Sequence, residues 1–190
     1  NYKNKAMREG IAEDKIFVVG NTIIEPLKKI ADLDYSGSEK HIILDIHRPE
    51  NFNHKDRLEK IIKFANLCNE KTGLSIKMLK FNRTIKNIKE FNLDLGCIEL
   101  VDLMGYKKFV RSMQDSLFFI SDSGTAQEEP ALLNIPVIVP RDYTERPESM
   151  KNNNSVLLDL NNEKKFSSMI EWAMEEKIMD TSWLGDGKTS

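Results

Sequence analysis

Three polar segments of the sequence hold residue types that can bind and act on an anionic ligand. The first, residues 47–51 (HRPEN), directly follows a run of β-forming residues, 41–46. A turn needs only one or two polar or conformationally restricted residues, so five in a row indicate chemistry at a strand end. His47 and Arg48 are the candidates for catalysis or phosphate binding. An alternative stays open, in which His47 only hydrogen-bonds a loop and Arg48 pairs with Glu50.

The second segment, residues 122–125 (DSGT), follows the apolar run 117–121. We predict that a helix begins there. Its free backbone N–H groups, two hydroxyls and the positive end of the helix dipole would together suit a phosphate or diphosphate. Glu128 or Glu129, one turn further on, would reach ribose hydroxyls, because carboxylates repel phosphate and accept hydrogen bonds from OH groups. The alternative is an ordinary helix start that one of the two hydroxyls caps.

The third segment, residues 141–148 (RDYTERPE), follows the predicted strand 137–139 and opens a long polar stretch that we expect at the surface. By itself it fits a solvated charged loop. Ligands of open parallel sheets bind at the carboxyl ends of the strands, however, and all three polar segments follow strands. The sequence has no GxGxxG after the first predicted strand and no GxxxxGK[ST], which disfavours dinucleotide oxidoreductases and P-loop kinases.

The elements that must position these segments follow an α/β pattern, since short apolar runs alternate with segments of helical periodicity. Such a pattern is typical of a mostly parallel sheet with flanking helices. The predicted strands are residues 16–19, 41–46, 75–79, 98–100, 117–121, 137–139 and 155–158. Apolar residues recur at helical spacing over 58–68, 85–91, 109–113 and 166–174. Residues 51–53 are predicted to cap the helix that starts near Lys55.

Length and composition exclude several classes of protein. The 190 residues suffice for one sizeable core, and 28 basic against 30 acidic residues give a net charge of −2. We therefore expect no nucleic-acid partner and no anionic membrane surface as partner. No apolar run approaches the roughly 20 residues of a spanning helix, and the first residues lack the layout of a signal peptide, so we expect a cytoplasmic protein. Cys68 and Cys97 stand far apart and indicate neither a disulfide framework nor a zinc site.

In their order and spacing, the three segments resemble the C-terminal half of the UDP-N-acetylglucosamine 2-epimerase family. The similarity begins at IFVVGNT, residues 16–22, which is similar to the family's interdomain TGNT segment, and extends to GDG, residues 185–187. The resemblance implies two Rossmann-like domains facing across a cleft, the glycosyltransferase-B architecture. Residues 1–190 would be the single UDP-binding domain. The N-terminal domain would lie outside this chain, which begins at Asn1 without a Met.

The resemblance also implies roles for individual residues. His47 looks like the family's active-site histidine, and residues 123–125 occupy the positions that hold the UDP phosphates. Glu129 matches the position that binds the ribose, Phe109 the one that contacts the uracil region, and Arg146 a further substrate contact. The expected UDP-binding residues are thus Arg48, Phe109, Ser123, Gly124, Thr125, Glu129 and Arg146.

The family inverts C2 of the sugar, by elimination of UDP to a 2-acetamidoglucal and re-addition on the other face. Such chemistry needs acid and base groups at the sugar and stabilisation of the departing UDP, with no redox cofactor and no metal. The family's proton-transfer carboxylates lie mostly in the N-terminal domain. We therefore expect this chain alone to bind UDP without turnover, as half of an enzyme that interconverts UDP-GlcNAc and UDP-ManNAc.

Several alternatives remain open on the sequence. Thr125 stands where many family members have Gly, a variant associated with epimerases of UDP-2-acetamido-2,6-dideoxy sugars, whereas residues 127–130 and 144–148 match the UDP-N-acetylglucosamine enzymes. A hydrolysing 2-epimerase and a glycosyltransferase of the same architecture are further alternatives. The resemblance also implies a homodimer for the full-length enzyme and a place in surface polysaccharide biosynthesis.

Overall fold

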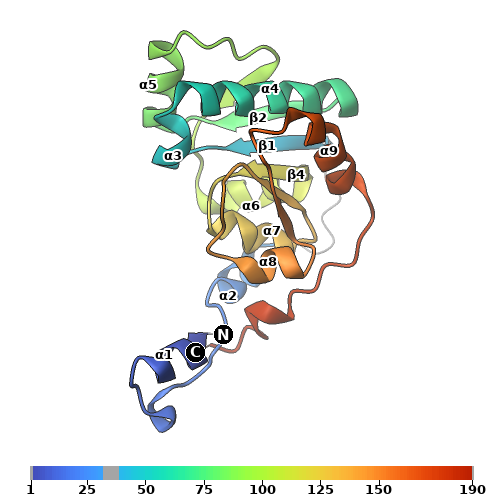
Figure 1. Ribbon diagram of the computed structural model, residues 1–190. Helices are drawn as coiled ribbons and strands as arrows, with labels where there is room; N and C mark the ends of the chain where they lie inside the picture. Colours follow the sequence, from blue (N-terminus) through green and yellow to red (C-terminus); the bar gives the residue numbers. More distant parts are fainter. Residues whose placement is uncertain (1, 32–38, 190) are drawn as a thin grey trace.

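The apolar runs of the sequence form a six-stranded parallel sheet in a computed structural model that describes residues 2–31 and 39–189 (Figure 1). The strand order is β3-β2-β1-β4-β5-β6, which is the order of doubly wound Rossmann sheets. The strands are β1 His41–Asp45, β2 Ser75–Leu79, β3 Ile98–Val101, β4 Ser116–Ser121, β5 Val137–Val139 and β6 Ser155–Leu157. The predicted α/β class with a parallel sheet and flanking helices is confirmed.

Helices cover both faces of this sheet. Figure 1 shows α4 and α9 on one side of the strands and α6 and α7 on the other. The helices are α1 Tyr2–Arg8, α2 Ile24–Ile30, α3 Pro49–Phe52, α4 Lys55–Thr72, α5 Asn82–Glu90, α6 Tyr106–Asp115, α7 Glu129–Leu132, α8 Pro147–Lys151 and α9 Phe166–Met174. Among the described ranges, no helix combines the length and apolar character needed to cross a bilayer.

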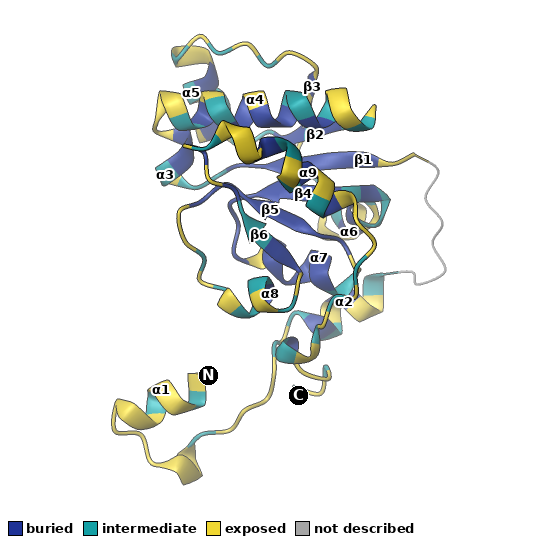
Figure 2. Cartoon of the chain, turned by 45° about the vertical axis from the view of Figure 1, so that its right-hand side comes forward, coloured by how far each residue is buried: buried dark blue, intermediate teal, exposed yellow. Residues whose placement is uncertain are grey.

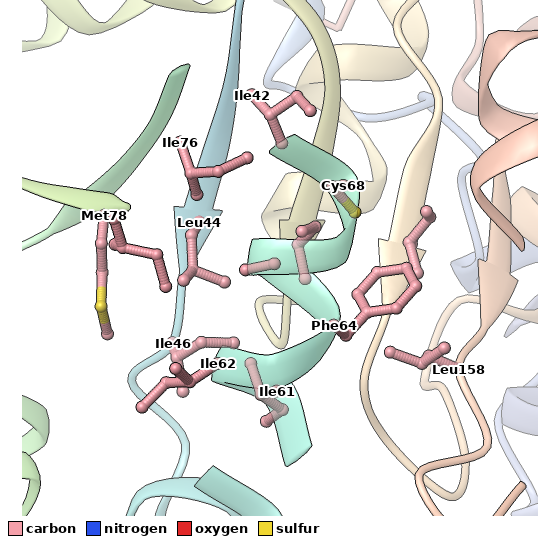
Figure 3. Packing of buried hydrophobic residues seen from close by; sticks show 14 of the residues in the cluster. Ile42, Leu44, Ile46, Ile61, Ile62, Phe64, Cys68, Ile76, Met78 and Leu158 are labelled. Atoms are coloured by element: carbon pink, nitrogen blue, oxygen red, sulfur yellow. The ribbon is translucent and has the colours of Figure 1, made fainter. Parts of the chain in front are cut away.

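Strand residues alternate between two hydrophobic layers, because successive side chains of a strand point to opposite faces. Ile42 and Leu44 belong to the layer under α4 and α9, whereas Ile43 belongs to the layer with α6. Figure 3 shows Phe64 of α4 facing Leu158 within the first layer. The Phe64 ring meets Phe166 edge-on, with centroids 5.0 Å apart. The sheet is therefore buried on both faces, as continuous apolar strands require.

The longest helix, α4, follows the predicted apolar stripe. Leu58, Ile61, Ile62, Ala65 and Cys68 are all buried. The helix ends at Gly73, whose φ of 71° is left-handed, a conformation that glycine adopts without steric cost. The predicted cap at its other end is wrong. Residues 51–53 belong largely to the separate turn α3, which Pro49 opens, and the residue preceding α4 is His54, which makes no side-chain cap.

The predicted first strand, residues 16–19, is also wrong. This segment pairs with no strand among the described residues, and Phe17, Val18 and Val19 are 83%, 74% and 51% exposed. Figure 2 shows it as an exposed stretch between α1 and α2. The apolar, β-branched composition was the signal, but a strand exists only where a neighbour satisfies its backbone N–H and C=O groups. The described part of the chain supplies no such neighbour.

The contact between α4 and α9 generates a stability prediction. We expect Phe64→Ala to lower the free energy of unfolding by about 3–5 kcal/mol, because it leaves a cavity in a fully buried layer. Ile178→Ala is the control, since Ile178 is 92% exposed and its loss should change stability by less than about 0.5 kcal/mol. Urea unfolding followed by circular dichroism measures both values. A loss below about 1 kcal/mol for Phe64→Ala would contradict this account of the packing.

Candidate functional site

A cleft of about 400 Å³ lies at the carboxyl ends of β1, β2 and β4. It adjoins the point between β1 and β4 where the strand order reverses, which is where open α/β sheets bind ligands. Its polar lining is Asp45, His47, Tyr106, Ser123, Thr125 and Glu129. Its apolar lining is Leu79, Phe81, Leu103, Met104, Phe109, Met113, Phe119 and Ala126. The cleft lining thus combines polar and apolar side chains.

Five of the eight residues proposed from the sequence line this cleft. They are His47, Phe109, Ser123, Thr125 and Glu129. Gly124, Arg48 and Arg146 lie outside its lining. Gly124 is nevertheless close to Arg48, because a Cβ built at Gly124 would lie 3.9 Å from Arg48 Nη2 and 3.6 Å from Glu145 Oε2. Arg48 and Glu145 therefore lie beside Gly124.

The carboxylate of Asp122 joins the first two polar segments. It accepts hydrogen bonds from the backbone N–H of His47 at 3.0 Å, from that of Arg48 at 3.1 Å and from Asn51 Nδ2 at 3.0 Å. Asp122 is completely buried, and this burial raises the pKa of its carboxyl. Three donors offset the cost of burying the carboxylate. The end of β1 is thereby held against the end of β4.

His47 has a second carboxylate partner, which sequence reasoning missed. Asp45 Oδ1 lies 2.9 Å from His47 Nδ1, and Ser121 Oγ donates to Asp45 Oδ2 at 2.8 Å. The hydrogen bond to Asp45 raises the pKa of His47, against the opposing effect of burial. The available signal was an acidic residue inside an apolar strand, two positions before the histidine and so on the same side of that strand.

The segment after β4 differs from the predicted helix start. Residues Thr125–Gln127 form a single 3-10 turn, and α7 after it has only four residues. A helix dipole at this point is accordingly weak. Neither Ser123 nor Thr125 caps a helix. Their hydroxyl oxygens lie 3.0 Å apart, beside the cleft that both residues line.

The two glutamates after β4 have different surroundings. Glu129 lines the cleft and accepts a hydrogen bond from the hydroxyl of Tyr106 at 2.7 Å. Burial raises the pKa of Glu129, and burial also raises the pKa of Tyr106. Glu128 instead pairs with the guanidinium of Arg146. Of the two glutamates, Glu129 is therefore the one that lines the cleft.

The third polar segment is not a solvated loop throughout. Arg141 is 2% exposed, and its guanidinium pairs with Glu50 at 2.9 Å and with Glu145 at 3.1 Å. Thr144 Oγ1 donates to Gln127 Oε1 at 2.6 Å, which ties this segment to the loop after β4. Residues Pro147–Lys151 then form α8. The expectation of a surface segment holds for most of residues 141–154, which are exposed or half-buried. Arg141 is an exception, because its buried guanidinium pairs with two carboxylates.

The alternative that the sequence left open, a pair between Arg48 and Glu50, is not what the structure shows. Glu50 pairs with Arg141, and Arg48 Nε is buried without a hydrogen-bond partner among the described residues. Arg48 Nη2 lies near Gly124, and a guanidinium with an unpaired N–H suits an anionic ligand. No cluster of three or more His, Cys, Asp or Glu side chains arranged for a metal ion occurs within residues 2–31 and 39–189.

Comparisons with known proteins place these features in a wider context. A family model described as UDP-N-acetylglucosamine 2-epimerase matches residues 1–190. The UDP-N-acetylglucosamine 2-epimerase of Methanocaldococcus jannaschii is 33% identical, and the match covers 98% of this chain and 56% of that protein. The corresponding enzyme of Methanococcus maripaludis is 32% identical, with 81% of this chain and 47% of that protein covered. The chain therefore spans about half the length of the curated relatives that it matches.

Two solved structures extend the similarity to three dimensions. The crystal structure of the Methanocaldococcus jannaschii enzyme in complex with UDP-GlcNAc and UDP superimposes with a TM-score of 0.87 at 32% identity, covering 98% of this chain and 56% of that one. The Neisseria meningitidis enzyme bound to UDP-GlcNAc gives a TM-score of 0.76 at 26% identity, with the same coverage of both chains.

The buried carboxylate generates the prediction for the site. We expect Asp122→Ala to lower the free energy of unfolding by about 3 kcal/mol, because it leaves one buried and two part-buried donors without their acceptor. Asp122→Asn should cost less, since its amide oxygen can still accept a hydrogen bond. Asp56→Ala, at an exposed aspartate, should cost less than about 1 kcal/mol and is the control. Equal losses of unfolding free energy for Asp122→Ala and Asp56→Ala in urea would refute the proposal that Asp122 holds the ends of β1 and β4 together.

Proposed function

The chain belongs to the UDP-N-acetylglucosamine 2-epimerase family, and from this premise we propose that it is the UDP-binding half of an enzyme that interconverts UDP-GlcNAc and UDP-ManNAc. One observation carries the proposal. A single cleft at the β1/β4 switch point gathers the histidine, the hydroxyl pair and the carboxylate that the family resemblance assigns to substrate. Together they suit a nucleoside diphosphate, whose parts are a planar base, a ribose with free hydroxyls and two phosphates.

UDP would lie across the cleft with each part beside groups of matching chemistry. The phosphates would meet the hydroxyls of Ser123 and Thr125, with Arg48 beyond Gly124 as the nearby cation. The ribose hydroxyls would donate to Glu129. The uracil would lie near Phe109, whose ring already packs edge-on against Phe119 with centroids 6.3 Å apart. An additional cation, Arg146, lies outside the cleft lining and pairs with Glu128.

The proposed reaction is an elimination followed by an addition. The bond from C1 of the sugar to the diphosphate oxygen breaks, its electron pair goes to that oxygen, and a base removes the proton at C2. Re-addition of UDP and return of a proton to the other face of C2 give the epimer. His47 would donate a hydrogen bond to the oxygen that gains charge. The acid and base groups at C2 and C3 would come from the N-terminal domain, outside this chain.

We propose accordingly that the chain is one Rossmann-like domain of a two-domain enzyme of the glycosyltransferase-B type. Alone it should bind UDP and should not epimerise UDP-GlcNAc. A second candidate substrate is a UDP-2-acetamido-2,6-dideoxy sugar, which Thr125 favours because its side chain reaches the cleft where many family members have glycine. A cytoplasmic location, a full-length homodimer and the absence of a nucleic-acid partner are further proposals that rest on the sequence alone.

The test is a calorimetric titration of the chain with UDP and, in parallel, with pyrophosphate. Ser123→Ala should weaken both ligands about 5-fold, because it removes a phosphate hydrogen bond of about 1 kcal/mol. Glu129→Ala should weaken UDP by a similar factor and leave pyrophosphate unchanged, because only UDP carries a ribose. Ser168→Ala, at an exposed serine of α9, is the control and should change neither affinity.

Three results would contradict the proposal. The first is that a chain that circular dichroism shows to be folded binds neither UDP nor pyrophosphate at millimolar concentration. The second is an equal loss of affinity for both ligands in Glu129→Ala, and the third is epimerisation of UDP-GlcNAc by the chain alone. The last would place the missing acid and base groups within these 190 residues.

A further inference from the structure

We propose that Asp45 is a positioning residue that fixes the His47 ring, with its Nδ1 proton held and its Nε2 directed to the ligand, and favours the cationic form of that ring. The statement that this cation acts on the departing diphosphate rests on the proposed function. The pairing itself stands on contacts within the chain. Asp45 would touch neither substrate nor reacting atoms and would act through His47.

The tautomer follows from the chemistry of the partner. Asp45 Oδ1 lies 2.9 Å from His47 Nδ1, and an ionised carboxylate only accepts hydrogen bonds, so Nδ1 must carry a proton. Nε2 makes no hydrogen bond to the described residues and is left for the cleft that His47 lines. The Phe81 ring, tilted at 46° with centroids 4.9 Å apart, packs beside the imidazole. The ring therefore has one fixed orientation in the structure.

Asp45 is itself held in place. It is 5% exposed, and Ser121 Oγ donates to its second oxygen at 2.8 Å. Ser121 Oγ in turn accepts the backbone N–H of Ser123 at 3.0 Å. A continuous set of hydrogen bonds thus runs from the loop proposed for the phosphates, through Ser121 and Asp45, to the imidazole. The loop and the histidine are positioned relative to each other by this set.

The charges around the ring favour the imidazolium. The titratable or charged groups on the elements packed around it are Asp45 of β1, Arg48 of the same loop, Asp122 after β4 and, across the cleft, Tyr106 of α6 and Glu129 of α7. Asp122 Oδ1 lies 3.6 Å from Nδ1. The hydrogen bond to Asp45 makes the largest contribution to raising the pKa of His47, while burial and Arg48 lower it. Removing the charge of Asp45 must therefore lower that pKa.

This arrangement would let His47 serve both directions of the reaction. The imidazolium donates from Nε2 to the diphosphate oxygen as the bond to C1 breaks and the oxygen gains the electron pair. If the proton follows, the ring becomes neutral with Nδ1 still bound to Asp45, and the same proton returns to Nε2 when UDP adds again. A ring that was free to rotate would lose this alignment. The contact with Asp45 prevents such rotation.

The test is an NMR titration of the imidazole nitrogens in the ¹⁵N-labelled chain, whose three histidines are His41, His47 and His54. In the wild-type chain we expect His47 to titrate above its ordinary pKa and to show the Nδ1–H tautomer at high pH. Asp45→Asn keeps an acceptor but removes the charge, and should lower the pKa of His47 by about one unit or more, a tenfold change in proton affinity. Asp56→Asn makes the same chemical change at an exposed site and should not move it.

Two outcomes would overturn the proposal: an Nε2–H tautomer of His47 in the wild-type chain, or a His47 pKa that is the same in Asp45→Asn. The tautomer result needs no variant, so it decides even if Asp45→Asn fails to fold. UDP affinity measured against pH separates this inference from the proposed function. Wild-type affinity should fall as pH rises through the His47 pKa, and that midpoint should move down in Asp45→Asn. Absence of UDP binding would count against the proposed function. The imidazole titration would still test the positioning role of Asp45.

Discussion

The arrangement of the site depends on one buried carboxylate, that of Asp122. Its hydrogen bonds to the backbone of His47 and Arg48 and to the Asn51 side chain join the ends of β1 and β4 across the point where the strand order reverses. A buried carboxylate without partners would be strongly destabilising, so the HRPEN turn has to keep its donors directed at Asp122. The same constraint presents the His47 ring to the cleft and sets Arg48 beside Gly124.

The remaining polar segment is attached to this centre by a second set of contacts. Buried Gln127 accepts from Thr144 and donates to the backbone of Ser123, so the loop after β5 is tied to the loop after β4. Arg141 links that loop to Glu50 of α3. These contacts need the rigid apolar sheet beneath them, because side chains hold precise distances only when their backbones are fixed by packing. The two hydrophobic layers therefore serve the site as well as stability.

Most of the fold could be predicted because its signals are local. Continuous apolar runs identified β1, β2, β4 and β5, and helical spacing identified α4, since strands and helices buried on the sheet must carry these patterns. Residues 16–19 carry the same signal, yet no neighbouring strand pairs with them in the described chain. Pairing is a property of two segments, so a local pattern cannot establish it.

For the site, the sequence by itself determined the chemical inventory: a histidine, two hydroxyls beside a glycine, glutamates and arginines, each placed after a strand. Only the tertiary structure decided which of these meet. It selected Glu129 over Glu128 for the cleft, paired Glu50 with Arg141 in place of Arg48, and set Asp45 and Asp122 around His47. The physical reason is that spacing along a strand fixes the side on which a residue lies. Hydrogen-bond and ion-pair partners depend on distances between strands and loops far apart in the chain.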